Sequence, residues 1–488
     1  MLQAHNCRSP KFLFINPPRC GKVPVIREDR CEITERSSVI PPYSLLQMAA
    51  ILRENGHCVD LIDANGIYAS YADISREISY SKHFYNFLVF RFTPTTFDWD
   101  MNTARMIKKL SPNTKVVGLC YTLGTLSERV MLESPYMDIY IRDGYESVIS
   151  KLASVLVCGD SLACVEGITY RNSSGEIVAN PPASPIEDYN SLPLPAYDLL
   201  GDMWEYYMNT SVGSPFSIVY ASKGCPYGCK FCNVSRTKWM KRDADSVIYE
   251  LMYLKKEKKI RTVSFFDETF TIDRDRVEGI CKAIRTHNLR IKWYCNTRVD
   301  LVDEELLKMM RASGCEGISF GVESGSDKIL NSINKGFSVN QAERAIKISK
   351  RAGIKVNCSF VVGFPEENKS TIEETKKFVS RTLPNGAQFN VFVPYPGTPL
   401  YEEIFCKESK VDWRLLYQDH SITSTENMSS SDIDRTRVNM YRSLYINPGW
   451  WLNNIWHVCS QPRDFPMAFA YVRRIFSNFV VHGMNDAH

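Results

Sequence analysis

Short apolar runs alternate with amphipathic stretches along the first part of the chain. Residues 11–16 are one such run, and residues 59–63 are the next. Between them, residues 43–55 carry apolar side chains three and four positions apart. A short apolar run between turn residues predicts a buried strand, whereas spacings of three and four predict a helix with one buried face. Further strands are predicted at 87–92, 115–119 and 137–142, and further helices at 98–110, near Leu126 and from Glu146.

Strands that alternate with helices predict a doubly wound parallel α/β sheet for this part of the chain. The loops that follow the strands of such a sheet are where its ligands bind. Three of these loops carry polar or aromatic side chains, at 93–96, 120–122 and 143–146. We therefore expect a ligand-binding edge at the carboxyl ends of these strands.

A second strand–helix series begins after a change in composition. Residues 184–197 contain several prolines and few bulky apolar side chains, which is typical of an extended linker. Beyond it, six strands, each followed by a helical stretch, are predicted at 217–221, 262–266, 292–296, 317–321, 356–362 and 388–394. Units of this kind fit a partial or complete βα barrel. The predicted domains are an N-terminal doubly wound domain (1–183), a linker (184–200), a barrel (201–400) and a helical C-terminal domain (401–488).

The C-terminal stretch has a helical pattern and is rich in aromatic side chains. It contains Trp413, Trp450, Trp451 and Trp456. Tryptophans at helical spacing usually belong to a core, and a lid over a neighbouring cavity is the alternative.

The bulk composition is that of a globular protein. Of the 488 residues, 44% are hydrophobic and 23% are charged, and the formal net charge is +4. A weak charge spread over a long chain does not indicate a nucleic-acid partner. No apolar run of about 18 residues is present, which argues against a transmembrane helix. Residues 1–10 lack the apolar core of a signal peptide, so we expect a cytoplasmic protein.

Sixteen cysteines in a chain without a secretion signal require an explanation that suits a reducing compartment. Most of them stand singly among apolar residues and are expected to pack in the core. Cys295 and Cys358, in two predicted barrel strands, are interpreted in this way. Cys225, Cys229 and Cys232 differ, because they lie together in one short loop.

This loop directly follows the first predicted barrel strand. Its cysteines are spaced by four and three positions, and Gly224 and Gly228 permit the tight turns that wrapping around one centre requires. Thiolates are soft donors that suit iron–sulfur clusters and zinc. Structural zinc takes four ligands, and neither Cys nor His occurs between Cys232 and Cys281. A cubane held by three cysteines leaves one iron open for a ligand, and a zinc site is the alternative.

The spacing Cys-x3-Cys-x2-Cys, with the aromatic Phe231 before the last cysteine, resembles the signature of the radical S-adenosylmethionine (SAM) superfamily. This resemblance implies a four-iron four-sulfur (4Fe-4S) cluster on Cys225, Cys229 and Cys232, whose open iron binds SAM. It also implies reductive cleavage of SAM to a 5′-deoxyadenosyl radical. The residues implied to bind SAM, which lie in the cysteine loop or follow successive predicted strands, are Phe231, Asp267, Glu268, Arg298, Glu323, Ser324, Gly363 and Pro394.

Each of these pieces has another interpretation when it is taken alone. Asp267 and Glu268 offer carboxylates for the ammonium group of SAM, but an acidic pair is also common at the start of a helix. Glu323 could cap the turn that follows it. The joint order of the pieces at strand ends, where barrel enzymes keep their sites, favours the SAM interpretation.

The N-terminal part resembles that of one subgroup, the class B methyltransferases, in which a cobalamin-binding domain precedes the radical SAM barrel. Residues 41–45 match the first helix of that subgroup. The loops at 118–122 and 142–146 depart from its usual patterns, and no Asp-x-His-x-x-Gly motif supplies a histidine for cobalt, as is ordinary there. A protein-interaction domain without the cofactor is the alternative. The residues implied to bind cobalamin are Pro17, Thr93, Thr95, Thr96, Tyr121, Thr122, Gly144, Tyr145 and Glu146.

With both cofactors, the resemblance implies methylation of an unactivated carbon. One SAM methylates cobalamin, a second provides the radical that abstracts hydrogen, and the carbon radical then takes the methyl group. An electron donor such as flavodoxin or ferredoxin is an implied partner. The sequence does not identify the acceptor, for which a peptide or protein side chain is the leading candidate. The alternatives are a non-methylating radical SAM enzyme (a cyclase, deoxygenase or oxidase) and a non-catalytic metal-binding scaffold.

Overall fold

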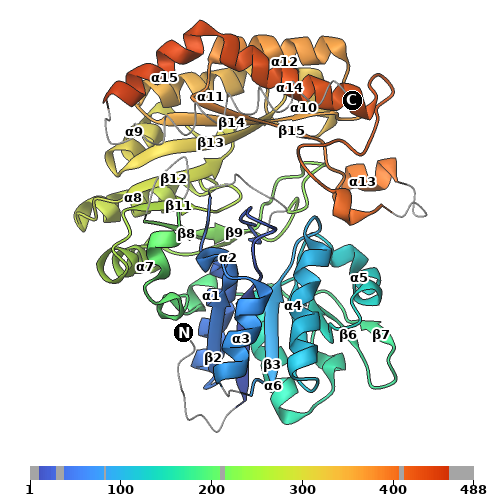
Figure 1. Cartoon of the computed structure of the whole chain (residues 1–488). Coiled ribbons are helices and arrows are strands. Elements are labelled where there is room, and N and C mark those ends of the chain that lie inside the picture. The colour runs from blue at the N-terminus through green and yellow to red at the C-terminus, as the bar shows by residue number, and fades with distance from the viewer. Residues whose placement is uncertain (1–9, 29–37, 82–83, 209–214, 406–410, 461–488) are drawn as a thin grey trace.

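The computed structural model describes residues 10–28, 38–81, 84–208, 215–405 and 411–460. Two sheets organise these residues, one in each half of the chain (Figure 1). The first sheet has the strand order β2-β1-β3-β4-β5-β6-β7. Its strands are β1 (Lys11–Asn16), β2 (Cys58–Asp63), β3 (Phe87–Arg91), β4 (Lys115–Leu119), β5 (Ile139–Ile141), β6 (Ile168–Arg171) and β7 (Ile177–Ala179).

Helices cover both faces of this first sheet. The chain passes from β1 outward to β2 and then back beyond β1 to β3. Because crossovers between parallel strands are right-handed, the helices of these two connections lie on opposite faces. Helix α1 packs against α6, and α3 packs against α4. The helices are α1 (Tyr43–Glu54), α2 (Ala64–Ile67), α3 (Tyr71–Ser81), α4 (Phe97–Leu110), α5 (Ser127–Glu133) and α6 (Tyr145–Cys158).

The predicted doubly wound sheet is therefore confirmed, and the structure adds an antiparallel edge to it. Strand β6 runs antiparallel to β5, and β7 runs antiparallel to β6. The turn between β6 and β7 is closed by a hydrogen bond from Gly175 N to Asn172 O, and Gly175 has a φ of +87°. Glycine adopts this left-handed conformation without a steric penalty.

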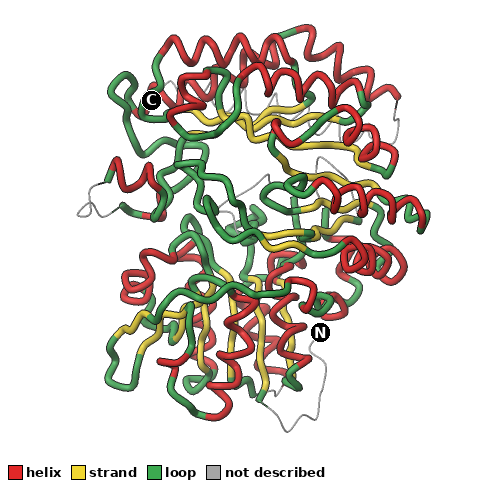
Figure 2. Tube along the Cα trace, turned by 180° about the vertical axis from the view of Figure 1, so that it is seen from behind, coloured by secondary structure: helices red, strands yellow, loops and turns green. Residues whose placement is uncertain are grey.

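The second sheet is an open partial barrel of parallel strands, as predicted. Its order is β8-β11-β12-β13-β14-β15, and β8 and β15 form its two edges. Figure 2 shows its helices on the outer side of the strands and many loops between the two sheets. The strands are β8 (Phe216–Val219), β11 (Thr262–Phe265), β12 (Lys292–Thr297), β13 (Cys315–Glu323), β14 (Lys355–Val362) and β15 (Gly386–Val391). The helices are α7 (Ala244–Glu257), α8 (Arg274–Thr286), α9 (Glu304–Ala312), α10 (Asp327–Ser332), α11 (Val339–Arg351), α12 (Lys369–Thr382) and α13 (Pro399–Ile404).

Alternation along the barrel strands separates a packed side from a cavity side. In β13, Ile318, Phe320 and Val322 are buried, whereas Ser319 and Gly321 between them line a cavity. Successive side chains of a strand lie on opposite faces, so this sequence places apolar groups under the helices and small polar groups in the barrel interior.

Within the predicted helical C-terminal part, residues 430–460 form α14 (Ser430–Ile446) and α15 (Pro448–Ser460), whereas residues 416–429 are irregular. Trp413 is fully buried and packs edge-on against Phe97 at 5.3 Å between ring centroids. Trp450 is also buried, and its indole N–H donates to Pro384 O at 3.1 Å. The core interpretation thus holds for these two tryptophans, while the side chain of Trp456 lies outside the described residues.

Among the helices of the described residues, none combines the length and the hydropathy that crossing a bilayer requires. The domain bounds given above stay a prediction.

Candidate active site

The three clustered cysteines lie in a loop that a small ribbon closes. Strand β9 (Ser222–Lys223) pairs antiparallel with β10 (Met240–Lys241), so the chain leaves and returns at one place. Inside the loop, Cys232 N donates to Cys229 O at 3.3 Å. Gly224 has a φ of +87°, and a Cβ there would lie 2.2 Å from Lys238 O. Only glycine fits this position, because any side chain would collide with the backbone.

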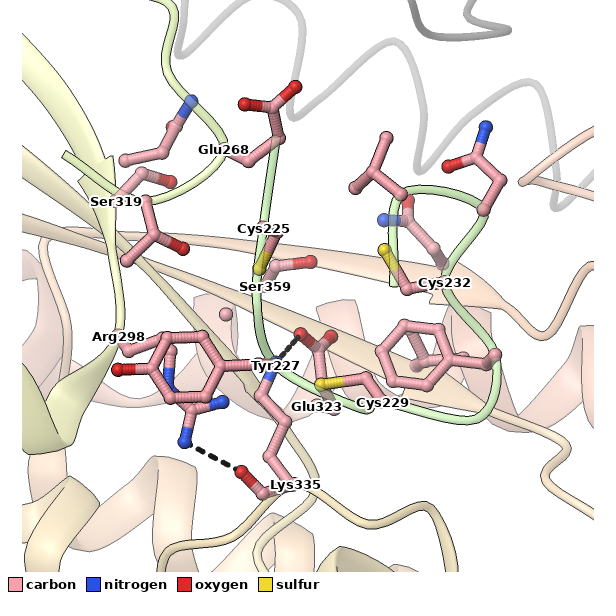
Figure 3. Close-up of a pocket in the computed structure, with 18 of the residues that line it drawn as sticks. Cys225, Tyr227, Cys229, Cys232, Glu268, Arg298, Ser319, Glu323, Lys335 and Ser359 are labelled. Atoms are coloured by element: carbon pink, nitrogen blue, oxygen red, sulfur yellow. Dashed lines mark hydrogen bonds and ion pairs between the residues drawn. The ribbon is translucent and has the colours of Figure 1, made fainter. Parts of the chain in front are cut away.

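All three cysteines are free and line one cavity of about 310 Å³, together with residues from the inner face of the barrel (Figure 3). Within the described residues, no three His, Cys, Asp or Glu side chains converge as the ligands of a single ion would. Three ligands of a cubane each bind a different iron and need not converge on one point. The donor set, three soft thiols on one loop, therefore fits a 4Fe-4S cluster better than a zinc ion.

Burial favours the protonated thiol at Cys225 and Cys232 when no metal is bound. Burial raises the pKa of Cys225, and it raises the pKa of Cys232 to about 12. Metal binding requires the thiolate, so a cluster entering this site displaces these protons.

A buried ion pair stands beside the cysteines. Lys335 Nζ lies 2.7 Å from Glu323 Oε1, and each side chain is 8% exposed. Burial alone would lower the pKa of Lys335, but the carboxylate of Glu323 outweighs it and raises that pKa. Arg298 donates to Lys335 O at 2.8 Å, and its guanidinium lies 3.8 Å from the centroid of the Tyr227 ring. The cavity thus has a charged, tightly bonded rim (Figure 3).

Uncharged polar groups line the barrel wall next to this rim. Ser319, Ser359 and Asn390 come from the adjacent strands β13, β14 and β15, and all three line the cavity. Their side chains make no hydrogen bond to any part of the chain that the structure describes. They are available to a ligand.

Four of the eight residues expected to bind SAM line the cavity. These are Phe231, Glu268, Arg298 and Glu323. Glu268 Oε2 also accepts a hydrogen bond from Gly224 N at 3.0 Å, which ties the carboxylate to the start of the cysteine loop.

Asp267 does not line the cavity, although its neighbour Glu268 does. Its carboxylate is fully buried and accepts hydrogen bonds from Ala221 N at 2.9 Å and Ser222 Oγ at 2.5 Å. It also lies 3.6 Å from Nη1 of Arg276. Adjacent residues after a strand face opposite ways, so only one of the two acids can face the cavity. In this structure Asp267 supports the strand end instead.

Ser324, Gly363 and Pro394 are likewise absent from the cavity lining among the described residues. Ser324 Oγ lies 3.2 Å from Thr375 Oγ1 and accepts from Ser326 N. Gly363 has a φ of +97°, and its N–H donates to the buried carboxylate of Glu367 at 2.5 Å. These two residues shape the turns after β13 and β14.

Sequence reasoning missed several residues of the cavity. Lys335 follows α10 in a connecting loop and meets Glu323 only through the tertiary fold. Gln418 reaches the cavity from the segment after α13, and its amide donates to the Tyr395 hydroxyl at 3.0 Å. No local pattern marks either residue. Tyr227 could have been predicted from the sequence, because it lies between Cys225 and Cys229 in the motif itself. Cys295 and Cys358 are buried away from the cavity, as expected.

The residues expected to bind cobalamin gather at the carboxyl ends of β1, β3, β4 and β5. Several of them take part in a buried polar network. Thr96 Oγ1 lies 2.8 Å from Thr93 Oγ1 and donates to Asp100 at 2.7 Å. Arg27 Nη2 pairs with Asp100 at 2.6 Å, and Arg27 Nη1 donates to Pro17 O at 2.9 Å. This part of the edge is held by its own hydrogen bonds.

A second group from that edge meets the cysteine loop directly. Lys223 Nζ lies 2.8 Å from Glu146 Oε1 and 4.0 Å from the centroid of the Tyr145 ring. The Tyr121 ring stacks on that of Tyr145 at 5.7 Å. The loops after β4 and β5 therefore lie next to the start of the cysteine loop.

Comparison with known proteins agrees with this arrangement. Residues 219–379 match the radical SAM superfamily. An uncharacterised methyltransferase of Pyrococcus horikoshii, PH0819, is 31% identical over 414 residues, which cover 84% of this chain and 88% of that protein. The anaerobic magnesium-protoporphyrin IX monomethyl ester cyclase of Rubrivivax gelatinosus is 30% identical over 357 residues, covering 71% of this chain and 63% of the cyclase.

A solved structure shares the fold of most of the chain. The radical SAM methyltransferase TsrM of Kitasatospora setae, with cobalamin and a 4Fe-4S cluster bound, superposes with a TM-score of 0.67 at 17% identity. The superposition covers 81% of this chain and 78% of TsrM. At this level of identity the likeness concerns the fold.

Proposed function

The chain belongs to the radical SAM superfamily, and on that premise we propose that it is a cobalamin-dependent methyltransferase that adds a methyl group to an unactivated carbon. The observation that carries the proposal is that Cys225, Cys229 and Cys232 line one cavity with the charged groups that a zwitterionic ligand needs. The relative PH0819, named a methyltransferase, supports the methyl-transfer part.

In this proposal the three cysteines hold the 4Fe-4S cluster and the adjoining rim holds SAM. Glu268 lines the cavity and accepts a hydrogen bond from the start of the cysteine loop, so we assign its carboxylate to the ammonium group of SAM. Phe231 and Tyr227 provide aromatic walls. Glu323 and Lys335 form an ion pair beside the cysteines and present polar groups of both kinds to the ligand.

Cobalamin is assigned to the carboxyl end of the first sheet, and the side chains there fit its chemistry. The ring of cobalamin is broad, flat and fringed with amides, and it suits aromatic surfaces and hydroxyl groups. Tyr121 supplies a partly exposed ring that stacks on the buried Tyr145, and Thr95 supplies a partly exposed hydroxyl. When bound, the cluster and cobalamin supply the electron and the methyl group, while the protein contributes position and exclusion of water.

The acceptor is assigned to the space between the barrel wall and the first sheet. Ser319, Ser359 and Asn390 offer free hydrogen-bonding groups there. A peptide or protein side chain remains the leading candidate for the acceptor, and a flavodoxin- or ferredoxin-type protein is the expected electron donor.

The test measures the amounts of both SAM products in anaerobic reactions that contain cobalamin, a reductant and candidate peptide fractions. The proposal predicts S-adenosylhomocysteine and 5′-deoxyadenosine in equal amounts, together with a product heavier by one methylene. If methylated product never accompanies turnover and S-adenosylhomocysteine is absent, methyl transfer is excluded.

A non-methylating radical reaction is the second candidate, because a relative at 30% identity is named a cyclase. That reaction would release 5′-deoxyadenosine without S-adenosylhomocysteine. Measuring the two SAM products therefore distinguishes the two functions. A non-catalytic scaffold would release neither product.

A further inference from the structure

Lys223 connects the two regions that the proposed function assigns to the two cofactors. It is the last residue of β9 and stands two positions before Cys225. Its ammonium group, however, lies against the loops of the first sheet, 2.8 Å from Glu146 Oε1. We propose that Lys223 is a positioning residue that sets where the cluster loop stands relative to the cobalamin-facing loops. This inference rests on the proposed function.

The contact on the first sheet is well ordered around the lysine. Its Nζ lies 4.0 Å from the centroid of the Tyr145 ring and 4.9 Å from that of Tyr121. The two rings are stacked with an interplanar angle of 16°, and Tyr145 N donates to the Tyr121 hydroxyl at 2.9 Å. Glu146 lies in the first turn of α6, where the helix dipole favours a carboxylate. The ammonium thus meets one carboxylate and two ring faces, an arrangement that fixes its position.

The backbone that connects Lys223 to Cys225 is equally constrained. Lys223 is opposite Met240 in the β9–β10 ribbon. Gly224, the residue between Lys223 and Cys225, donates its N–H to Glu268 at 3.0 Å and has no room for a Cβ next to Lys238 O. A change in the position of Lys223 is therefore transmitted to Cys225 instead of being absorbed by a flexible connection.

Burial distinguishes this ion pair from another pair that joins the same two parts of the chain. The side chains of Lys223 and Glu146 are 11% and 4% exposed. Arg414, from the segment after α13, pairs with Asp98 of α4, and these side chains are 29% and 70% exposed. An exposed pair is screened by water and tolerates changes in geometry, whereas a buried pair must keep its distances because neither charge can turn to solvent.

The position of the cluster matters because radical transfer between two sites depends on geometry. A displacement of about 1 Å can cost on the order of a hundredfold in rate. Residues that touch neither reactant can therefore control the reaction by fixing the distance between two cofactor sites. Lys223 is placed to do this through one side chain.

The experiment compares Lys223→Met with the wild-type chain after anaerobic loading with iron, sulfide and cob(II)alamin. The readout is the electron paramagnetic resonance signal of cob(II)alamin when the cluster is reduced, since the magnetic coupling of the two centres depends on their separation. We expect Lys223→Met to keep its iron and to lose the wild-type coupling pattern. Lys223→Arg, which keeps the positive charge, is expected to restore most of it.

Arg414→Ala is the matched control, because it removes a contact between the same parts of the chain away from Lys223. It is expected to leave the coupling as in the wild type. Lys223→Gln serves as a second charge-free variant if Lys223→Met does not fold. An unchanged coupling in the charge-free variants, or an equal loss in Arg414→Ala, would overturn the inference. A wild-type chain that binds iron but no cobalamin would instead overturn the proposed function, and this inference with it.

Discussion

The carboxyl ends of the two sheets hold their polar side chains in opposite ways. At the barrel end, Ser319 and Ser359 line the cavity and make no side-chain hydrogen bond within the described part of the chain. At the end of the first sheet, Thr93 and Thr96 bond to each other, and Thr96 bonds to the buried Asp100. Polar groups left available beside a cavity are suited to a ligand, whereas groups that satisfy one another stabilise the fold.

This difference explains why one site is recognisable from geometry and the other is not. The cysteine loop and its charged rim identify the barrel end as a binding site without reference to any relative. The first sheet presents a largely self-satisfied edge, so its assignment to cobalamin depends on resemblance and on the contact with Lys223. The predictions below test whether the two ends really differ in this way.

The largest effect is expected from Arg27→Met in the network of the first sheet. Arg27 is buried and pairs with the fully buried Asp100 at 2.6 Å. Its removal leaves a carboxylate without a counter-charge, which should lower the free energy of unfolding by about 3–5 kcal/mol. Thermal or urea unfolding measures this loss.

The control for Arg27→Met is Arg414→Ala, which removes a partly exposed cation whose partners Asp98 and Glu133 are 70% and 32% exposed. That change should cost no more than about 1 kcal/mol. If the two variants lose the same stability, the network of the first sheet is not the structural element described here.

Gly224→Ala should have the next largest effect and should act at the cysteine loop. A Cβ at this position would lie 2.2 Å from Lys238 O, and the φ of +87° disfavours alanine. The strain should cost about 1–3 kcal/mol, and we expect the iron content after reconstitution to fall. Gly175→Ala is the matched control, because Gly175 has the same φ of +87° but nothing within 4 Å of its Cβ. A normal iron content in Gly224→Ala would contradict the prediction.

The stability is expected to depend on pH through Glu367, a buried acidic side chain near the barrel end. Unlike Asp100, Glu367 has no basic partner among the described residues. Burial raises its pKa from 4.5 to about 8. An unfolded chain releases this proton near pH 4.5, whereas the folded chain keeps it until about pH 8, so stability falls as the pH rises between these values. Between pH 6 and pH 8 the fall should be about 2 kcal/mol.

Glu367→Gln cannot ionise and should lack this part of the pH dependence. Unfolding midpoints of both chains at pH 6 and pH 8 provide the comparison. Parallel changes in the two chains would show that Glu367 is already ionised in the folded state.

The smallest effect is expected from Ser359→Ala on the cavity wall. The Ser359 hydroxyl makes no hydrogen bond within the described residues, so its loss should change the free energy of unfolding by less than about 0.5 kcal/mol. Thr96→Ala removes a buried hydroxyl that donates to Asp100 and should cost about 1–2 kcal/mol. Equal losses in unfolding experiments would remove the distinction between the two sheet ends.

Periodicity predicted the elements of the fold well, because each strand is a short apolar run closed by turn residues. The run at 115–119, for example, is β4 without any change of bounds. The antiparallel pair β6 and β7 was not predicted from the pattern, since both strands are short and β7 is partly exposed. Strand direction depends on the connection and is not encoded in the strand itself.

The candidate site was predicted in part for a similar reason. The cysteine motif is local, so sequence alone places its sulfurs in one loop. The side on which Asp267 and Glu268 lie depends on how the chain leaves β11, and sequence reasoning treated the two acids alike. Lys335 was missed because its partner Glu323 is twelve positions away across a helix and two turns. Contacts of this kind are set by the tertiary fold.

The most direct test of the central claim is the iron content and SAM cleavage of a chain in which Cys225, Cys229 and Cys232 are all replaced by alanine. The control replaces the exposed, free Cys158 and Cys164. After anaerobic reconstitution, the wild type and the control should be brown and should release 5′-deoxyadenosine from SAM when reduced, and the triple variant should do neither. A triple variant that keeps its iron–sulfur absorption and still releases 5′-deoxyadenosine would contradict the assignment.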